Sequence, residues 1–391
     1  MMLITSSPIS IWILYFVCLN QKKIIAMKLT YFMILMLLGH CFVGFSQVDD
    51  LTPEEQAYKD SITALNVENE AIANSQEAYN KGIALFSEKK YQQAIGEFEK
   101  SIQFDPNFSA AMYNKGVAEN EVDKYNDAVK TLTKLIGLKP SYSKAFFQRG
   151  RSYQGLNNYL AAENDYEKSI QLDGNNPKAY YNFGTLRFLQ FDYDGAIKYF
   201  SKTIELDNEM INAYNDRGSS YRMKGEYSKA LADYETAIRK NPDMAFVLNN
   251  IGSTKVKMKD FTGALASFNR AISIDPNFFL AYNNRGVVLM NQGRLDDAIK
   301  DFNKALVVNS KYSPAASNLS GVYFKKKDYQ KAMEMANKAI MMDKENGSAY
   351  VNRGNANEML RNMIGACEDW HKAKELGVEI GSAYYAGNCS N

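Results

Sequence analysis

The sequence predicts an all-α fold in which short antiparallel helix pairs stack into a solenoid, and two periodic rows of residues carry this prediction. Both rows repeat every 34 residues, nine times along a chain of 391 residues. The first row is glycine, with serine in one place: Gly82, Gly116, Gly150, Gly184, Gly218, Gly252, Gly286, Ser320 and Gly354. The second row stands twelve residues later: Ala94, Ala128, Ala162, Ala196, Ala230, Ala264, Ala298, Ala332 and Ala366. A fixed period of this length marks a protein in which each unit buries its apolar face only against its neighbours.

The pattern within each unit predicts two helices joined by a turn. In the fourth unit the apolar residues share one helical stripe: Ala196, Ile197, Phe200 and Ile204. Sixteen residues after the glycine a large apolar residue usually follows: Phe98, Leu132, Tyr166, Phe200, Tyr234, Phe268, Phe302 and Trp370, with Ala336 as the exception. We interpret the small residues as places where two helix backbones approach closely, with the large residue filling the space beside them.

The boundaries between units are marked by proline. Proline cannot continue a helix and pushes the residue before it out of the α region, so Asp105-Pro106 and Asp275-Pro276 are predicted to end units. No run of useful length alternates as a β-strand would. The unit with Ser320 and Ala336 lacks both the glycine and the large residue, and we expect it to be the least regular.

These offsets resemble the tetratricopeptide repeat (TPR), whose unit has 34 residues with small, aromatic and proline positions in this order. The resemblance covers residues 75–378 in nine units. It implies paired antiparallel helices stacked into a right-handed superhelix with a concave inner groove. The chain is therefore expected to hold one repeat domain, although its length alone would suggest two or three domains.

Residues 1–46 are predicted to form a removable leader. Translation is predicted to begin at Met27, because a basic start, an apolar stretch over 29–43, and small residues at Gly44 and Ser46 form a secretory signal over 27–46. The mature chain would be exported and periplasmic or extracellular. The alternative is a retained membrane anchor that holds the protein at the envelope, and this is the only membrane contact that the sequence suggests.

Residues 47–74 precede the repeats. Thr52 offers a capping hydroxyl, Pro53 suits the first helical position, and Glu54 and Glu55 place acids in the first turn. We expect a leading helix that ends near Ala73 and caps the first unit. The alternative is a mobile linker.

Two cysteines remain after residue 46, Cys367 in the last unit and Cys389 in the C-terminal tail over 379–391. In an exported chain such a pair predicts a disulfide, which would hold the tail over the open end of the stack. The alternative is two free thiols.

Composition and motifs argue against several classes of function. Without the first 46 residues, 43 basic and 44 acidic residues leave a formal net charge of −1, so no global attraction to nucleic acid or anionic lipid is expected. His371 is the only histidine left, and no phosphate loop, zinc signature, nucleophile elbow or dinucleotide fingerprint occurs in the repeats. We therefore expect no metal, no cofactor and no enzymatic activity.

Two charged rows repeat with the units. Basic residues precede the glycines at Lys81, Lys115, Arg149, Arg217, Arg285 and Arg353. Their stems are expected to cover neighbouring helices while the charged groups reach water. Acidic residues recur at Asp165, Asp233, Asp301 and Asp369, a repetition that indicates a structural role.

The row with the strongest functional signal stands two residues before each glycine: Asn80, Asn114, Gln148, Asn182, Asp216, Asn250, Asn284, Asn318 and Asn352. Asparagine is a poor helix former, so its recurrence needs a cause. A row of amides can both donate to and accept from the backbone of an extended peptide. It resembles the asparagine ladder along the groove of superhelical TPR proteins. The alternative is that each amide bonds within its own unit or is hydrated.

The function predicted from these observations is a non-enzymatic scaffold that binds a peptide or protein segment in the groove of the superhelix. Two alternatives stay open. The array could be a structural or assembly part of the cell envelope, or an adaptor that recruits substrates for a separate enzyme.

Overall fold

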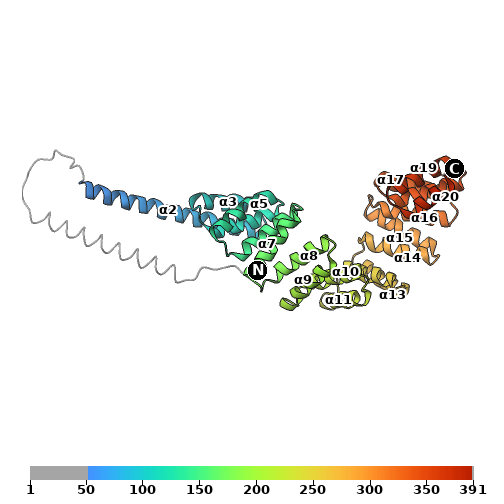
Figure 1. Ribbon diagram of the computed structural model, residues 1–391, viewed down its shortest axis with the longest axis horizontal. Helices are drawn as coiled ribbons and strands as arrows, with labels where there is room; N and C mark the ends of the chain where they lie inside the picture. Colours follow the sequence, from blue (N-terminus) through green and yellow to red (C-terminus); the bar gives the residue numbers. More distant parts are fainter. Residues whose placement is uncertain (1–51, 390–391) are drawn as a thin grey trace, which may run out of the picture. The chain divides into compact units, whose positions relative to one another are not determined.

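The computed structural model describes residues 52–389. Within this range the chain forms nineteen α-helices and no strand (Figure 1). The helices are α2 (Pro53–Ser87), α3 (Tyr91–Phe104), α4 (Ser109–Glu121), α5 (Tyr125–Leu138), α6 (Ser143–Gly155), α7 (Tyr159–Leu172), α8 (Pro177–Leu189), α9 (Tyr193–Leu206), α10 (Ile211–Met223), α11 (Tyr227–Lys240), α12 (Ala245–Lys257), α13 (Phe261–Ile274), α14 (Phe279–Asn291), α15 (Leu295–Val308), α16 (Ser313–Lys325), α17 (Tyr329–Met342), α18 (Gly347–Met359), α19 (Met363–Glu375) and α20 (Glu379–Asn388). The predicted leader, with its start and cleavage site, lies outside the described residues.

Contacts divide the chain into two units after Asn69, and the described part of the first unit is the N-terminal stretch of α2. This helix begins as predicted. The Thr52 hydroxyl accepts a hydrogen bond from the Glu55 backbone N–H at 3.3 Å, and Glu55 Oε2 accepts one from the Thr52 backbone N–H at 3.0 Å. The expected helix end near Ala73 is wrong. Since residues 54–81 contain no glycine or proline, α2 continues without a break to Ser87 and includes the first helix of the first repeat.

The second unit consists of helix pairs, in which α4 packs on α5, α6 on α7, and so on to α18 and α19. The predicted close approach within each pair is confirmed. A Cβ added at Gly252 would lie 2.5 Å from Cε1 of Phe268, and one added at Gly354 would lie 2.6 Å from Nε1 of Trp370. Glycine therefore lets the large side chain of the second helix lie directly against the first helix. All nine alanines of the second row are fully buried beside these contacts.

The turn inside each pair contains one residue with a left-handed backbone, always seven residues after the glycine position. These residues are Lys89, Asp123, Asn157, Phe191, Gly225, Lys259, Gly293, Lys327 and Arg361. Two of the nine are glycine, and Asp123 and Asn157 are of types that tolerate this conformation, so the repeat imposes it on the other five, which are lysine, phenylalanine or arginine.

The boundaries between units follow the predicted stops. Helix α3 ends at Phe104, and Asp105 has an extended backbone with φ of −128°. Its carboxylate accepts a hydrogen bond from the Asn107 backbone N–H at 2.9 Å, which fixes the turn into α4. Helix α13 ends in the same way at Ile274, before Asp275.

The unit with Ser320 is as regular as its neighbours, so the expectation of irregularity is wrong. Its helices have 13 and 14 residues, the lengths found in most other units. The buried Ser320 hydroxyl donates to the Ala332 carbonyl oxygen at 2.7 Å. Because Ala336 is small, the two helices approach closely here without a ring between them.

The C-terminal segment is helical and covers the last repeat. The ring of Tyr384 on α20 lies 5.4 Å from that of Trp370 on α19. A disulfide joins Cys367 to Cys389, with Cα atoms 5.7 Å apart. Helix α20 therefore occupies the end of the stack, where a solenoid would otherwise expose its core.

Candidate functional site

The asparagine row lies on the first helices of the repeats, and most of its members bind the preceding repeat. Asn284 Nδ2 donates to Asn249 Oδ1 at 2.9 Å, and Asn318 Nδ2 donates to Asn283 Oδ1 at 2.8 Å. A row amide also donates over the same separation of 35 residues in three other places: Asn250 to Asn215 Oδ1, Asn114 to the Tyr79 hydroxyl, and Asn352 to the Ser317 carbonyl oxygen. The row thus joins consecutive units by side-chain hydrogen bonds, a role in addition to the two considered from the sequence.

These bonds link into a longer chain because the acceptor asparagines also donate. Asn283 Nδ2 donates to Asn284 Oδ1 at 3.4 Å, and Asn215 Nδ2 donates to Asp216 Oδ1 at 2.9 Å. The acceptors Asn215, Asn249 and Asn283 are buried. Buried amides need partners, so this arrangement explains why a poor helix former recurs at these positions.

Asp216 is the one acidic member of the row. Its Oδ2 atom accepts a hydrogen bond from the Tyr181 hydroxyl of the preceding repeat at 2.6 Å. Burial raises the pKa of Asp216, and the hydrogen bonds from Tyr181 and Asn215 oppose that rise only in part. A carboxylate can only accept, so the direction of the inter-repeat bond is reversed here.

The remaining three members of the row, Gln148, Asn80 and Asn182, have other hydrogen-bond partners. Gln148 Oε1 lies within 3.4 Å of Asn120 Nδ2 on α4. Asn80 is exposed and accepts a hydrogen bond from Gln76 on its own helix. Asn182 donates only to the Lys178 carbonyl oxygen of its own helix at 3.0 Å, because the residue 35 positions earlier is Phe147, which has no polar side-chain atom.

Asn182 lines a hollow of about 290 Å³ that spans helices of three successive repeats. Its other lining residues include Asn120, Tyr125, Arg151, Gln154, Gly155 and Tyr159. A Cβ at Gly155 would lie 2.6 Å from Cζ of Tyr125, so the glycine lets this ring lie across the end of α6. The hollow combines two tyrosine rings, amides and one guanidinium group.

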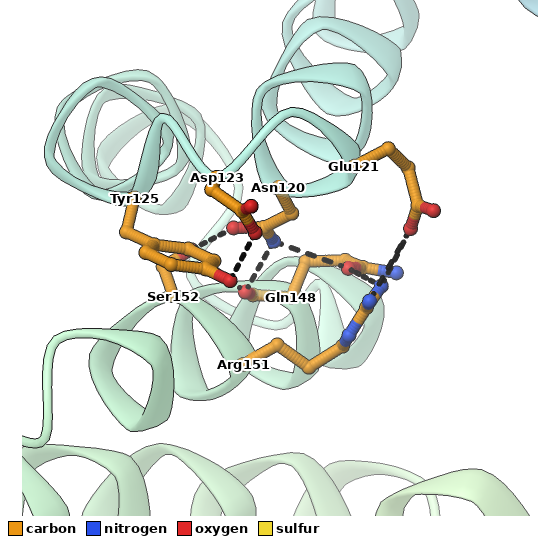
Figure 2. A network of polar contacts seen from close by, with 7 residues as sticks. All are labelled: Asn120, Glu121, Asp123, Tyr125, Gln148, Arg151 and Ser152. Carbon is orange, nitrogen blue, oxygen red and sulfur yellow. Dashed lines mark hydrogen bonds and ion pairs between the residues drawn. The ribbon is translucent and has the colours of Figure 1, made fainter. Parts of the chain in front are cut away.

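A polar network beside the hollow fixes the position of Arg151 (Figure 2). The guanidinium donates to Glu121 Oε1 at 3.2 Å and to Gln148 Oε1 at 3.1 Å. Asn120 Nδ2 donates to the Gln148 carbonyl oxygen at 3.0 Å, and the Ser152 hydroxyl donates to Asn120 Oδ1 at 2.7 Å. Because Asn120, Gln148 and Ser152 are buried, this network is a rigid base below the Arg151 cation, whose side chain is 34% exposed.

Asp123 completes the network at its edge. Its carboxylate accepts a hydrogen bond from the Tyr125 hydroxyl, and this bond raises the pKa of Tyr125 (Figure 2). The tyrosine therefore stays a neutral donor at the rim of the hollow.

A second hollow of about 400 Å³ contains another row residue, Asn318, together with Asp343 and Glu345. The amide nitrogen of Asn318 is already bonded to Asn283. The nine row residues therefore do not converge on one pocket. Of the two row members that line these hollows, Asn318 bonds to the preceding repeat and Asn182 does not.

The four arginines of the basic row also bind second helices through their guanidinium groups, rather than only covering neighbouring helices with their stems. Arg217 donates from Nε and Nη2 to the two carboxylate oxygens of Asp233 at 2.8 and 2.7 Å, and from Nη1 to Ser201 at 3.1 Å. The arginine thus binds the second helix of its own unit and that of the preceding unit. Arg149, Arg285 and Arg353 repeat this arrangement with Asp165, Asp301 and Asp369.

These ion pairs occur in every second unit, which gives the array a double-repeat period. In the intervening units the arginine position holds Phe183, Ile251 or Leu319. Phe183 stacks on Tyr199, which holds the aspartate position, with ring centroids 4.1 Å apart. The structural role predicted for the aspartates is confirmed, while the heads of the four arginines are held in ion pairs rather than left to water.

Among residues 52–389 no group of three or more histidine, cysteine, aspartate or glutamate side chains could hold a metal ion. In the same range no helix is long and apolar enough to cross a membrane.

The fold and the inter-repeat bonds define an α-helical repeat scaffold. Matches to the family described as tetratricopeptide repeat cover residues 78–108, 143–176, 177–210, 211–244, 279–312 and 314–346, and a match described as TPR repeat covers residues 252–293. Together they span more than half of the sequence, and the chain belongs to the tetratricopeptide repeat family. Repeats of this family are generally non-enzymatic interaction scaffolds.

Two solved structures with TM-scores above 0.5 show the same fold. A tetratricopeptide repeat protein from Parabacteroides merdae is 19% identical, with 62% of this chain and 97% of that chain covered and a TM-score of 0.54. One chain of the APC/C hetero-tetramer Cut9–Hcn1 is 17% identical, with 78% of this chain and 58% of that chain covered and a TM-score of 0.52. YrrB, described as a TPR protein with an unusual peptide-binding site, is 27% identical over 47% of this chain and 95% of that chain, with a TM-score of 0.38. A search of curated proteins finds no match.

Proposed function

We propose that this chain is a non-enzymatic scaffold that binds an extended peptide or protein segment along its first helices, with the hollow at Asn182 and Arg151 as the principal contact. The observation that supports the proposal is the hydrogen bonding and position of Asn182. Its carboxamide makes no bond to the preceding repeat and lines the hollow beside a cation on a rigid base. An amide in this position can donate to and accept from a peptide backbone.

The chemistry of the hollow suggests the kind of segment that it holds. Tyr125 and Tyr159 offer rings for apolar or aromatic side chains, while Arg151 favours a carboxylate or a backbone carbonyl oxygen. Each hydrogen bond contributes only about 0.5–1.5 kcal/mol net, so affinity requires further contacts along the array.

We also propose that the protein works outside the cytoplasm, in the periplasm or the extracellular space. The signal-like sequence over 27–46 supports this location, and so does the Cys367–Cys389 disulfide, since such bonds persist in oxidising compartments.

A structural or assembly role in the envelope is the second candidate. The observation that favours it is the use of most row amides in bonds between repeats, for example Asn284 to Asn249 and Asn318 to Asn283. In that role the row contributes rigidity, and the partner contacts another surface.

Site-specific photo-crosslinking in native cells distinguishes these functions. A photoreactive amino acid replaces Leu189, which lines the hollow, and a matched control replaces Val307, which is exposed on α15. We expect a defined crosslinked partner from position 189 and none from 307. Asn182→Ala and Arg151→Ala are each expected to lower that crosslink several-fold, while Asn80→Ala leaves it unchanged. A partner captured equally at both positions, or insensitive to the two substitutions, would reject binding in the hollow.

A further inference from the structure

Among the residues that the structure describes, nothing buries the N-terminal stretch of α2. Every residue from 52 to 70 is exposed, whichever face of the helix it lies on. Most of the stability of a helix in a protein comes from an apolar face packed against a neighbour rather than from helix propensity. A partner helix would therefore stabilise the exposed stretch.

The apolar residues of this stretch follow the spacing of a coiled-coil seam. Tyr58, Ile62, Leu65, Asn69 and Ile72 are separated by four, three, four and three residues. The four apolar side chains among them are 39–69% exposed, although residues of this kind are ordinarily buried. A spacing that averages 3.5 residues keeps one stripe facing a second helix that supercoils around the first.

The residue types of the seam favour a second copy of the same segment. Ile62 and Asn69 fall on the a positions, and Leu65 falls on a d position. Isoleucine at a with leucine at d favours two strands, and a single asparagine at a fixes the register of a parallel pair.

The flanking positions agree with the same pairing. In a parallel pair the g position of one helix faces the following e position of the other, which brings Glu54 opposite Lys59. The next two such pairs are Ser61 with Asn66 and Glu68 with Ala73. None of these three pairs joins like charges. The first a position of the segment holds Glu55, whose carboxylate accepts hydrogen bonds from Thr52 in the N-terminal cap, so the apolar seam begins at Tyr58.

We propose that residues 54–72 of α2 form a parallel, in-register, two-stranded coiled coil with the same segment of a second copy, so that the protein is a dimer of repeat arrays. In this pair Asn69 faces Asn69 of the second copy, where each amide meets a donor and an acceptor. Two arrays joined by this coiled coil would bind a repetitive or dimeric partner more tightly than a single array. Once the first array is bound, the second is held at a high effective concentration near the partner.

Disulfide trapping tests the register directly in the full, natively processed chain. Leu65→Cys places thiols at a d position, where equal residues of a parallel pair meet, and mild oxidation is expected to give a covalent dimer. Val67→Cys is the matched control, since Val67 is similarly exposed but lies at an f position on the outer face. No covalent dimer from Leu65→Cys, or equal yields from both variants, would overturn the proposal.

Sedimentation equilibrium supplies the second measurement. We expect the mass of a dimer for the unsubstituted chain and for Val67→Asp, and at least a tenfold weaker dimer for Ile62→Asp. A monomer at every soluble concentration of the unsubstituted chain would mean that another segment or protein covers the stripe, and the proposal would be wrong. A dimer that Ile62→Asp leaves intact would overturn it equally.

Discussion

The side-chain amide of Asn250 donates to Oδ1 of Asn215 at 3.1 Å, one residue more than a full repeat away. Asn215 in turn donates to Asp216, its neighbour on the same helix. Of these two neighbours on one helix, Asn215 bonds to the following repeat, whereas Asp216 accepts from Tyr181 of the preceding repeat. This relation makes the asparagine row part of the joint between repeats, and it separates the members that stabilise the stack from those that remain open to a ligand.

Asn284→Ala is expected to lower the free energy of unfolding by about 1–2 kcal/mol, because it leaves the buried Oδ1 of Asn249 without its donor. Asn182→Ala is expected to change it by less than about 0.5 kcal/mol, since it removes only a bond within one helix. Urea midpoints, with hydrogen exchange of the neighbouring helices, measure both effects. Equal losses for the two variants would contradict the distinction.

The repeats and their boundaries could be predicted from the sequence because they depend on short-range rules. A glycine beneath a ring, as at Gly252 and Phe268, gives a signal at a fixed offset within one unit. The end expected near Ala73 differs from the observed end at Ser87 because the polar helix formers between them give no stop signal.

The chemistry between repeats was harder to predict, because it depends on how one helix pair is rotated against the next. The separation of 35 residues that joins Asn250 to Asn215 follows from that rotation. A sequence signal for it exists, since the position before the row is mostly polar, and the apolar Phe147 leaves Asn182 without a bond to the preceding repeat. The bridge from Arg217 to Ser201 needs the same three-dimensional information.

Arg217→Leu is expected to lower the free energy of unfolding by about 3 kcal/mol. The substitution leaves the Asp233 carboxylate largely buried and without its bidentate partner, and such an unpaired charge is costly. The loss is measured from thermal midpoints and from hydrogen exchange of α10 and α11.

The chain itself supplies the matched control for this prediction. Leu319 and Met335 occupy the corresponding positions in the unit of α16 and α17. Combining Arg217→Leu with Asp233→Met copies that apolar pair, and we expect the double variant to recover most of the lost stability. A double variant as unstable as Arg217→Leu would show that the arginine acts through Ser201 or its stem rather than through the charge pair.

Asp216 is expected to make stability depend on pH. Burial raises the pKa of Asp216 in the folded protein above the usual 3.8. At pH values between the unfolded and the folded pKa, the folded state therefore holds more protons than the unfolded state. The free energy of unfolding therefore falls as the pH rises from acid to neutral, by about 1.4 kcal/mol for each pKa unit of difference. Asp216→Asn removes this dependence while its carbonyl oxygen still accepts from Tyr181. Thermal midpoints at several pH values test the prediction, and a difference between the two proteins that stays constant with pH would contradict it.

Phe191→Gly is expected to stabilise the protein by about 1 kcal/mol. Phe191 holds φ of 62° in the turn between α8 and α9, and its side chain is 77% exposed, so little packing offsets the left-handed backbone. Gly225→Ala is the converse change at the same repeat position, with φ of 79° and open space around the added methyl, and it should destabilise by a similar amount. Destabilisation by Phe191→Gly in the same urea titration would show that the exposed ring has a packing role.

Reduction of the Cys367–Cys389 bond is expected to destabilise the C-terminal end of the stack. A closed loop over a separation of 22 residues corresponds to roughly 3 kcal/mol of chain entropy. Because each repeat contacts only its neighbours, the loss should fall on α19 and α20, with little change in hydrogen exchange at α4 or α5. Cys389→Ser should reproduce the reduced state, and added reductant should then have no further effect. If both cysteines of the natively purified, folded protein react with an alkylating reagent, the bond does not form in the native compartment, and α20 is held over the last repeat by its packing on α19, including the contacts of Tyr384 with Trp370 and of Tyr385 with His371.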